Sequence, residues 1–453
     1  MRLQHYLIVT FPIFWLGVGK KYPFALLGES GPLIGIVFWS LVSLVWLLAL
    51  FNILSNSRSQ VKLENSSSKV FPVWLLLGGL AALVFDLIQW VQFRSIGYPV
   101  PWALFAVDIL WITYASIGFK GKQVPPKKWL VPAIGYGVIH RALSILVLPL
   151  TAARSDMLPA IQQAIGRFWS GLPAYAPSTG GIGQMLYLPG TWMSYIPAEF
   201  GPLGISFDPR WIGLSYFIML SLLIVYLQPR LKTTSIMLAV LWFTNPYLAF
   251  RHELYLDFFW LVLAVTTVIA QHRRPLLTGV MAGFSMLTLH WALILTPLWL
   301  LVATPKGNWK KLLASALIAV TIFCFGIGAF LNREGSYLVE GILMPMKWIR
   351  EGYRGELCLG LPPLFYKLGL KDFLQPLQLI MLFTIGLYTL IQWLPKKPKF
   401  LSSWSREGSQ FGPGPAVIPL ALTLFIFLNP FLENYFYLAP LLLFSLIIEN
   451  PDL

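Results

Sequence analysis

Long apolar stretches alternate with short polar connections along most of the chain. Many of the stretches are about 17–23 residues long, the length that an α-helix needs to cross the hydrocarbon core of a bilayer. The pattern predicts helical spans over 32–54, 70–93, 98–118, 129–151, 211–228, 233–250, 254–271, 275–289, 289–303, 312–331, 374–395, 416–430 and 432–448. The opening stretch 6–19 is interpreted as a retained anchor or a re-entrant segment. The predicted fold class is all-α, a polytopic transmembrane helical bundle of about 13 spans.

The distribution of basic residues indicates which face of this bundle is cytoplasmic. If 275–303 forms two short helices, the basic cluster that precedes this stretch and the basic cluster that follows it lie on the same side of the membrane. The segments on that side then hold 19 Lys and Arg against four acidic residues, while the opposite side holds 13 against 12. By the positive-inside rule, the first side is cytoplasmic. We therefore expect a multi-pass protein of a bacterial-type inner or plasma membrane.

Composition supports the membrane assignment. Of the 453 residues, 57% are hydrophobic and 11% are charged, whereas soluble domains have about 25% charged residues. These values exclude an ordinary soluble enzyme and a disordered chain. The net charge of +15 lies mostly on the cytoplasmic side, so it reports orientation and does not indicate a nucleic-acid partner.

The two longest non-spanning segments, 152–210 and 332–373, both fall on the outer side. Apolar residues recur at helical spacing in 155–170 and in 335–354, which predicts two amphipathic helices of the kind that lie in the membrane interface. The inner connections are short. Function is therefore expected on the extracytoplasmic face.

The first candidate constellation is Arg154-Ser-Asp156, where span 129–151 meets the first outer segment. A carboxylate at the water boundary can serve as a general base, and the arginine beside it can hold a phosphate. The alternative is an acidic residue in the first turn of a helix, stabilised by the helix dipole.

The second constellation runs from Arg251 to Asp257 at the outer start of span 254–271. Glu253 and Asp257 are spaced to share one helix face, and His252 is close by. This stretch has three possible interpretations: an acid–base pair, a metal site, or an interfacial anchor whose charges are solvated. A metal ion needs more ligands than this stretch offers.

Ionisable residues inside the spans form the third constellation. His140 and Arg141 lie within 129–151, and Asp86 and Asp108 each lie alone in a preceding span. Charges at membrane depth are costly and usually face a cavity or a partner, so two interpretations are open: the two aspartates neutralise Arg141, or these groups face a substrate. His290 lies at the outer turn between the two short helices. It is either a ligand or a polar side chain whose hydrogen bonds are satisfied within the protein.

Motifs for nucleotide-driven chemistry are missing from the sequence. It contains no P-loop, no G-x-G-x-x-G and no H-E-x-x-H. The pair Gly279 and Gly283 forms a G-x-x-x-G motif, which predicts close helix packing.

The order of features resembles the GT-C glycosyltransferases, integral-membrane enzymes that use polyprenyl-phosphate sugars, and in particular their bacterial mannosyltransferase-like branch. The resemblance begins with Arg154-Ser-Asp156, continues through Gly171-Leu-Pro173-Ala-Tyr175 and Tyr187-Leu-Pro189, and reaches the span that starts near Arg210. In that family the first outer loop starts with an acidic residue and contains an amphipathic helix, a Gly-x-Pro-Tyr-like turn and a Tyr-x-Pro element.

The resemblance continues downstream. The stretch from Glu253 to Asp257 is similar to the second acidic site of the family, and 277–297 is similar to its glycine-rich re-entrant pair, with His290 where the family often has lysine. The ending from Glu433 to Pro440 is similar to its last hairpin. The similarity covers 129–448 and divides the chain into N-terminal helices of unknown role, 1–128, and a GT-C-like catalytic module, 129–453.

The resemblance implies inverting transfer of a hexose, such as mannose, from a polyprenyl-phosphate donor to an acceptor hydroxyl at the extracytoplasmic face. It implies Asp156 as the catalytic base and requires no cofactor or metal. The donor-phosphate candidates are Arg154, Arg141, His140, Arg251, His252 and His290, and the acceptor or supporting acids are Glu253 and Asp257. The alternatives are a secondary transporter or lipid flippase, with Asp86, Asp108 and Arg141 lining the path, and a catalytically inactive GT-C-like scaffold.

Overall fold

The computed structural model describes residues 64–94, 100–120, 125–150, 157–177, 185–199, 207–245, 256–288, 290–350, 361–394, 414–429 and 438–448. Within these ranges the fold is all-helical, and the only β-type pairing is an isolated bridge between Leu231 and Ile448. The predicted all-α class is thus confirmed for the described part of the chain.

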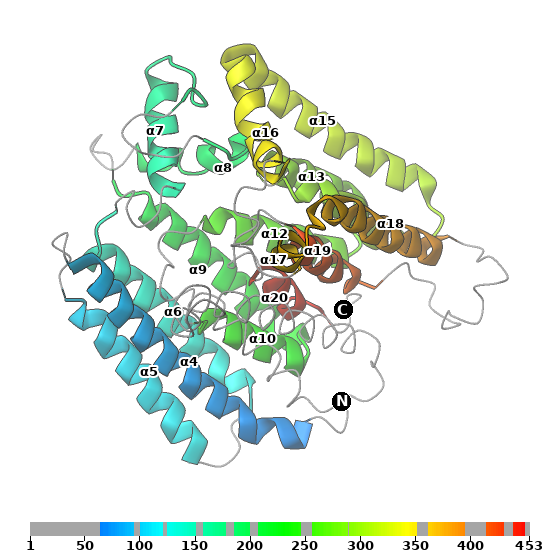
Figure 1. Ribbon diagram of the computed structural model, residues 1–453. Coiled ribbons are helices and arrows are strands. Elements are labelled where there is room, and N and C mark those ends of the chain that lie inside the picture. The colour runs from blue at the N-terminus through cyan, green and yellow to red at the C-terminus, as the bar shows by residue number, and fades with distance from the viewer. Residues whose placement is uncertain are drawn as a thin grey trace.

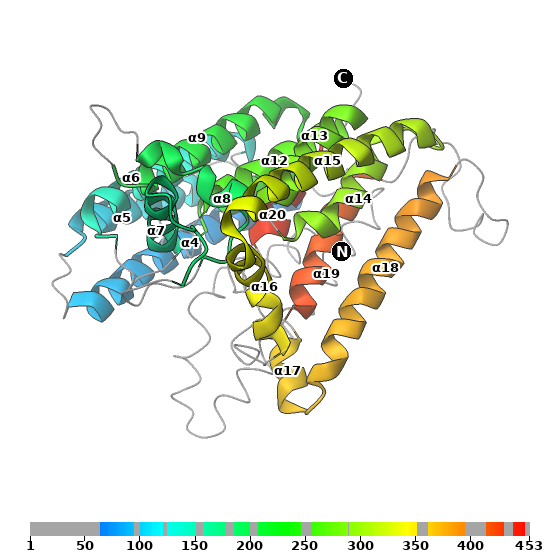
Figure 2. The same ribbon diagram turned by 90° about the horizontal axis from the view of Figure 1, so that it is seen from above.

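Sixteen α-helices are described, and Figures 1 and 2 show their arrangement. They are α4 (Glu64–Phe93), α5 (Trp102–Lys120), α6 (Lys127–Val147), α7 (Met157–Trp169), α8 (Pro189–Met193), α9 (Arg210–Leu227), α10 (Thr233–Phe243), α12 (Asp257–Gln271), α13 (Pro275–Thr288), α14 (Ala292–Ala303), α15 (Trp309–Glu334), α16 (Ser336–Arg350), α17 (Pro362–Lys367), α18 (Leu374–Trp393), α19 (Val417–Leu428) and α20 (Leu438–Ser445).

Each span predicted between 70 and 448 contains a helix, whereas 6–19 and 32–54 lie outside the described residues. Five helical segments are long and apolar enough to cross a bilayer, namely Phe71–Ile88, Lys127–Val147, Arg210–Arg230, Trp309–Glu334 and Lys371–Trp393. Five more apolar helices are shorter, namely Trp102–Gly118, Asp257–Gln271, Pro275–Thr288, Ala292–Ala303 and Val417–Leu428. These features are typical of a membrane protein, whereas the predicted number of spans stays a prediction.

Apolar side chains cover the outside of the bundle as well as its core. On α15 and α18, at one flank in Figure 2, Phe325 is 80% exposed and Phe383 is 71% exposed. Exposed apolar area of this extent on a soluble monomer would be an interaction site or an aggregation risk, whereas on a membrane helix it contacts lipid tails. The interior is rich in fully buried tryptophans, including Trp192, Trp242 and Trp299.

The α13–α15 pair shows the close packing that the G-x-x-x-G motif predicts. A Cβ atom built on Gly279 would lie 2.5 Å from the carbonyl oxygen of Ser315, and one on Gly283 would lie 2.9 Å from that of Ala319. Only glycine permits this approach of two backbones. The predicted break within 275–303 is also present, because α13 ends at Thr288 and α14 begins at Ala292.

The two predicted amphipathic helices are present as α7 and α16, and both lie at the upper edge of the molecule in Figure 1. Helix α7 buries Leu158, Ile161 and Ile165, and α16 buries Leu338. The two large segments meet each other, since a Cβ atom on Gly341 would lie 2.7 Å from the carbonyl oxygen of Met185. The two segments are therefore in direct contact with each other.

Candidate functional site

The first large segment is fixed to the bundle by a tyrosine that bonds in three directions. The backbone N–H of Tyr175 donates to the buried Glu334 carboxylate at the end of α15 (3.2 Å). Its hydroxyl donates to the carbonyl oxygen of Tyr187 (2.6 Å) and accepts from the indole N–H of Trp192 (3.2 Å). The Gly-x-Pro-Tyr-like turn thus anchors the loop that carries α8, and burial raises the pKa of Tyr175 far above its usual range, so its hydroxyl keeps its proton.

Below this loop, Arg141 of α6 and Asp257 of α12 form a buried ion pair. The Nη1–Oδ1 distance is 2.7 Å, and Nη2 also contacts Oδ2, so the pairing is bidentate. Arg141 is 0% and Asp257 is 2% exposed. The guanidinium also lies over the Phe217 ring, 5.4 Å from its centroid. Asp257 is the first residue of α12, where the helix dipole further stabilises a carboxylate.

Gly213 and Tyr195 border this ion pair on the side of the first loop. Gly213 of α9 leaves room for it, because a Cβ atom there would lie 3.1 Å from both Arg141 Nη2 and Asp257 Oδ2. The Tyr195 hydroxyl would be 3.6 Å from the same Cβ atom. Burial and the nearby Asp257 carboxylate raise the pKa of Tyr195 well above 10, so it remains a neutral hydroxyl.

The structure corrects the expected partner of Arg141. Asp86 and Asp108 do not neutralise it. They lie instead beside His140, whose Nε2 is 3.0 Å from Asp86 Oδ2 and 3.6 Å from Asp108 Oδ1. Successive residues of an α-helix point about 100° apart, so His140 faces α4 and α5 while Arg141 faces α9 and α12.

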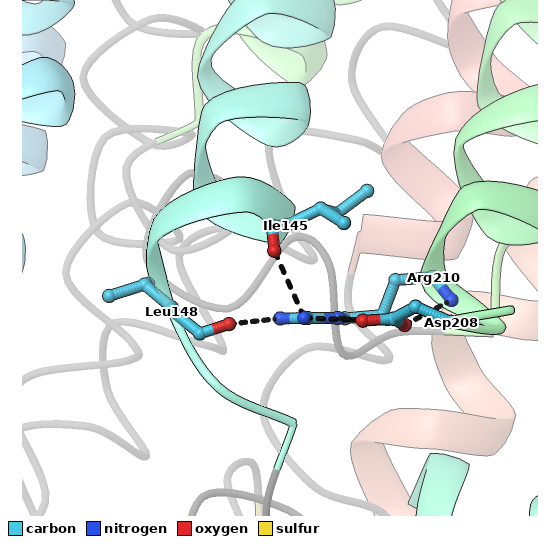
Figure 3. A network of polar contacts seen from close by, with 4 residues as sticks. All are labelled: Ile145, Leu148, Asp208 and Arg210. Carbon is cyan, nitrogen blue, oxygen red and sulfur yellow. Dashed lines mark hydrogen bonds and ion pairs between the residues drawn. The ribbon is translucent and has the colours of Figure 1, made fainter.

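A second arginine, which was not among the predicted site residues, closes the base of the first loop. Arg210, the first residue of α9, donates from Nη1 to the carbonyl oxygen of Leu148 (2.6 Å) and from Nη2 to that of Ile145 (3.0 Å), as Figure 3 shows. Its Nε also donates to Asp208 Oδ2 (2.8 Å), and its backbone N–H donates to Asp208 Oδ1 (2.9 Å).

Arg210 therefore supplies donors to terminal carbonyl groups of α6 that have no partner within the helix. The sequence does carry one signal here. In Asp208-Pro-Arg210, an acidic residue and a proline come directly before an apolar run, which is typical of the start of a helix. It identifies the helix start but gives no indication of the contact with α6.

His290 lies in the turn between α13 and α14, facing the second large segment. It is hydrogen-bonded to the backbone of Ile342 in α16, and burial lowers its pKa to about 4. Nearby, the Thr191 hydroxyl of α8 donates to the carbonyl oxygen of Thr288 (2.7 Å). His290 is therefore neutral at pH 7 and offers hydrogen bonding but no positive charge, so its predicted role in binding a phosphate would not rest on charge.

Acidification is expected to destabilise the protein through His290. A free histidine has a pKa of about 6.5, so between pH 6.5 and pH 4 the unfolded chain binds a proton that the folded chain does not. The free energy of unfolding should fall across this window by on the order of 1–3 kcal/mol. The measurement is thermal unfolding of the detergent-solubilised chain from pH 7 to pH 4. His290→Gln should flatten the profile, and an unchanged pH dependence in this variant would contradict the assignment.

The other predicted site residues lie outside the described residues. They are Arg154, Asp156, Arg251, His252 and Glu253. Their predicted roles, and the shared helix face of Glu253 and Asp257, therefore stay predictions. Among the residues that are described, the structure joins Arg141 to Asp257 and keeps His140 in a separate cluster.

Comparison with known proteins returned no match: no protein-family model fits the sequence, and neither a curated protein nor a solved structure is significantly similar to the chain.

Proposed function

We propose that the chain is a glycosyltransferase of the GT-C type, which transfers a hexose from a polyprenyl-phosphate carrier to an acceptor hydroxyl at the extracytoplasmic face of a membrane. The proposal rests on the ordered motif resemblance together with one structural observation. Arg141 and Asp257, both candidate residues from the sequence, are 116 positions apart and meet beside Tyr195 of the first large loop.

This observation favours an assembled site for two reasons. The ion pair is bordered by Gly213 and Tyr195, and Tyr195 belongs to the loop that the resemblance assigns to the active site. Tyr187 of the same loop also contacts the ring of Phe259 in the first turn of α12, with centroids 5.9 Å apart. Loop, α6, α9 and α12 thus converge at one end of the bundle.

The proposed reaction is a single inverting displacement. The Asp156 carboxylate takes the proton of the acceptor hydroxyl while the oxygen attacks the anomeric carbon. The bond from that carbon to the phosphate oxygen breaks, its electron pair leaves with polyprenyl phosphate, and Arg154, Arg251 and His252 are the cationic candidates for the phosphate. Both terminal nitrogens of Arg141 are engaged by Asp257, so we assign this pair a positioning role at the start of α12.

The decisive experiment is a transfer assay with the purified full-length chain in detergent. Radiolabelled polyprenyl-phosphate mannose is mixed with total membrane lipid and glycan as acceptor. The expected result is a labelled product, with release of polyprenyl phosphate in equal amount. A heat-inactivated sample is the control. Absence of transfer from mannose, glucose and galactose donors would overturn the proposal.

Ion-coupled transport is the second candidate, and a separate observation favours it. Asp86, Asp108 and His140 are buried ionisable residues on three apolar helices, and such residues inside membrane spans frequently mark ion or proton paths. Proteoliposomes distinguish the two functions. Proton-dependent uptake or lipid flipping without sugar transfer would favour the transporter.

A further inference from the structure

Four polar side chains form a cluster inside the bundle, away from the Arg141–Asp257 pair. Asp86 comes from α4, Asp108 from α5, and His140 and Tyr136 from α6. His140 Nε2 lies 3.0 Å from Asp86 Oδ2 and 3.6 Å from Asp108 Oδ1, and the Tyr136 hydroxyl donates to Asp108 Oδ1 (2.8 Å). The first three residues are at most 3% exposed.

The three helices bring these side chains to a common depth. Asp86 is seven residues before the end of α4, Asp108 is six residues after the start of α5, and His140 is seven residues before the end of α6. At about 1.5 Å per residue, each lies about 10 Å from the helix end that faces the first large loop. Helices α4 and α5 lie side by side at one flank, with α6 next to α5 (Figure 1).

The charges of the cluster are not balanced by the protein. Two carboxylates share one imidazole, and among the described residues neither aspartate forms an ion pair with a lysine or arginine. Asp108 Oδ2 is buried and has no hydrogen-bond partner within that part of the chain. Because an uncompensated charge in an apolar interior is costly, the cluster needs additional positive charge.

We propose that Asp86, Asp108 and His140 bind a divalent transition-metal ion, with Zn²⁺ as the ion that best fits the donor set. Zn²⁺ is bound by imidazole nitrogen and carboxylate oxygen at about 2.0–2.2 Å. Two ligands of a tetrahedral ion at those bond lengths are about 3.3–3.6 Å apart. The His140–Asp108 separation of 3.6 Å falls in this range, and the His140–Asp86 separation of 3.0 Å needs to widen by about 0.3 Å. One ligand atom of each residue lies within 4.8 Å of the others.

The side chains around the three ligands support a metal site and indicate the role of the ion. Tyr136 bonds a ligand oxygen of Asp108, in the way that outer-shell groups orient metal ligands. A dication also neutralises both carboxylates while the imidazole stays neutral. The ion links α4 and α5, which belong to the region without a counterpart in the resembled family, to α6. This structural role is independent of the proposed sugar transfer.

The experiment measures metal directly in the purified full-length chain. Elemental analysis after dialysis should find about one ion per chain, and removal with a strong chelator should lower the unfolding temperature, which Zn²⁺ restores. Co²⁺ added to the stripped protein should produce the visible absorption of a tetrahedral site. Tyr136→Phe should weaken Zn²⁺ binding by about 10–100-fold, and His140→Gln should abolish it.

The matched control is Asp372→Asn, which removes an exposed carboxylate remote from the cluster and should leave metal content unchanged. A purified chain without metal, whose unfolding temperature is insensitive to chelator and which gives no Co²⁺ spectrum, overturns the proposal. The cluster then holds a proton, and the wild-type measurements decide this even where a variant fails to fold.

Discussion

Replacing Asp257 with alanine is expected to lower the free energy of unfolding by about 3–5 kcal/mol, because it leaves the Arg141 guanidinium buried without a counter-ion. Arg141 has no exposed surface, and both of its terminal nitrogens bond to Asp257. Denaturant unfolding of the chain in detergent, followed by tryptophan fluorescence, measures the loss. A loss below 1 kcal/mol would show that the pair is not buried as described.

A double variant separates stability from function at the same site. Arg141→Met with Asp257→Leu removes both charges and keeps approximate volume, so most of the lost stability should return. If the ion pair positions the start of α12 for sugar transfer, this folded variant should nevertheless have lost activity. Recovery of both stability and transfer would restrict the pair to a structural role.

Replacing Asp156 with asparagine is expected to reduce transfer by about 10²–10⁴-fold, the usual contribution of a general base. Asparagine has almost the same shape but cannot accept the acceptor proton at neutral pH. Binding of the polyprenyl-phosphate donor should change little, so the loss should appear in the turnover number. The measurement is initial transfer rate against donor concentration.

Asp372→Asn serves again as the control, since it neutralises an exposed carboxylate of the second large segment. It should keep wild-type turnover and unfolding temperature. Full activity in Asp156→Asn would remove Asp156 as the base and leave Glu253, within the Arg251–Asp257 stretch, as the next acidic candidate to test.

The helices were predictable because apolar length and turn residues are local properties. The two amphipathic helices α7 and α16 were predicted from apolar spacing, and the interruption at His290 from the basic clusters on either side of 275–303. Helix ends were less well predicted. The span expected over 233–250 contains a helix that ends at Phe243, two residues before Asn245-Pro246, and the residue before a proline avoids helical geometry.

The partners of the buried charges were not predictable from the sequence, because they depend on which neighbour each helix face meets. His140 and Arg141 are adjacent in the chain, and the sequence left the preceding aspartates and a substrate as equally open partners for Arg141. In the structure, these aspartates lie beside His140, and Arg141 pairs with Asp257. No local pattern distinguishes the two pairings.

The bonds of Arg210 to Leu148 and Ile145 have a consequence for how this protein can vary. They hold the residue where the first large loop departs against the residue where it returns. Because the loop begins and ends at one fixed point, its length can change at a small entropic cost and without displacing α6 or α9. Changes of length are therefore expected in the parts of this loop that lie away from its buried contacts, such as those of Tyr175 and Thr191 with the bundle.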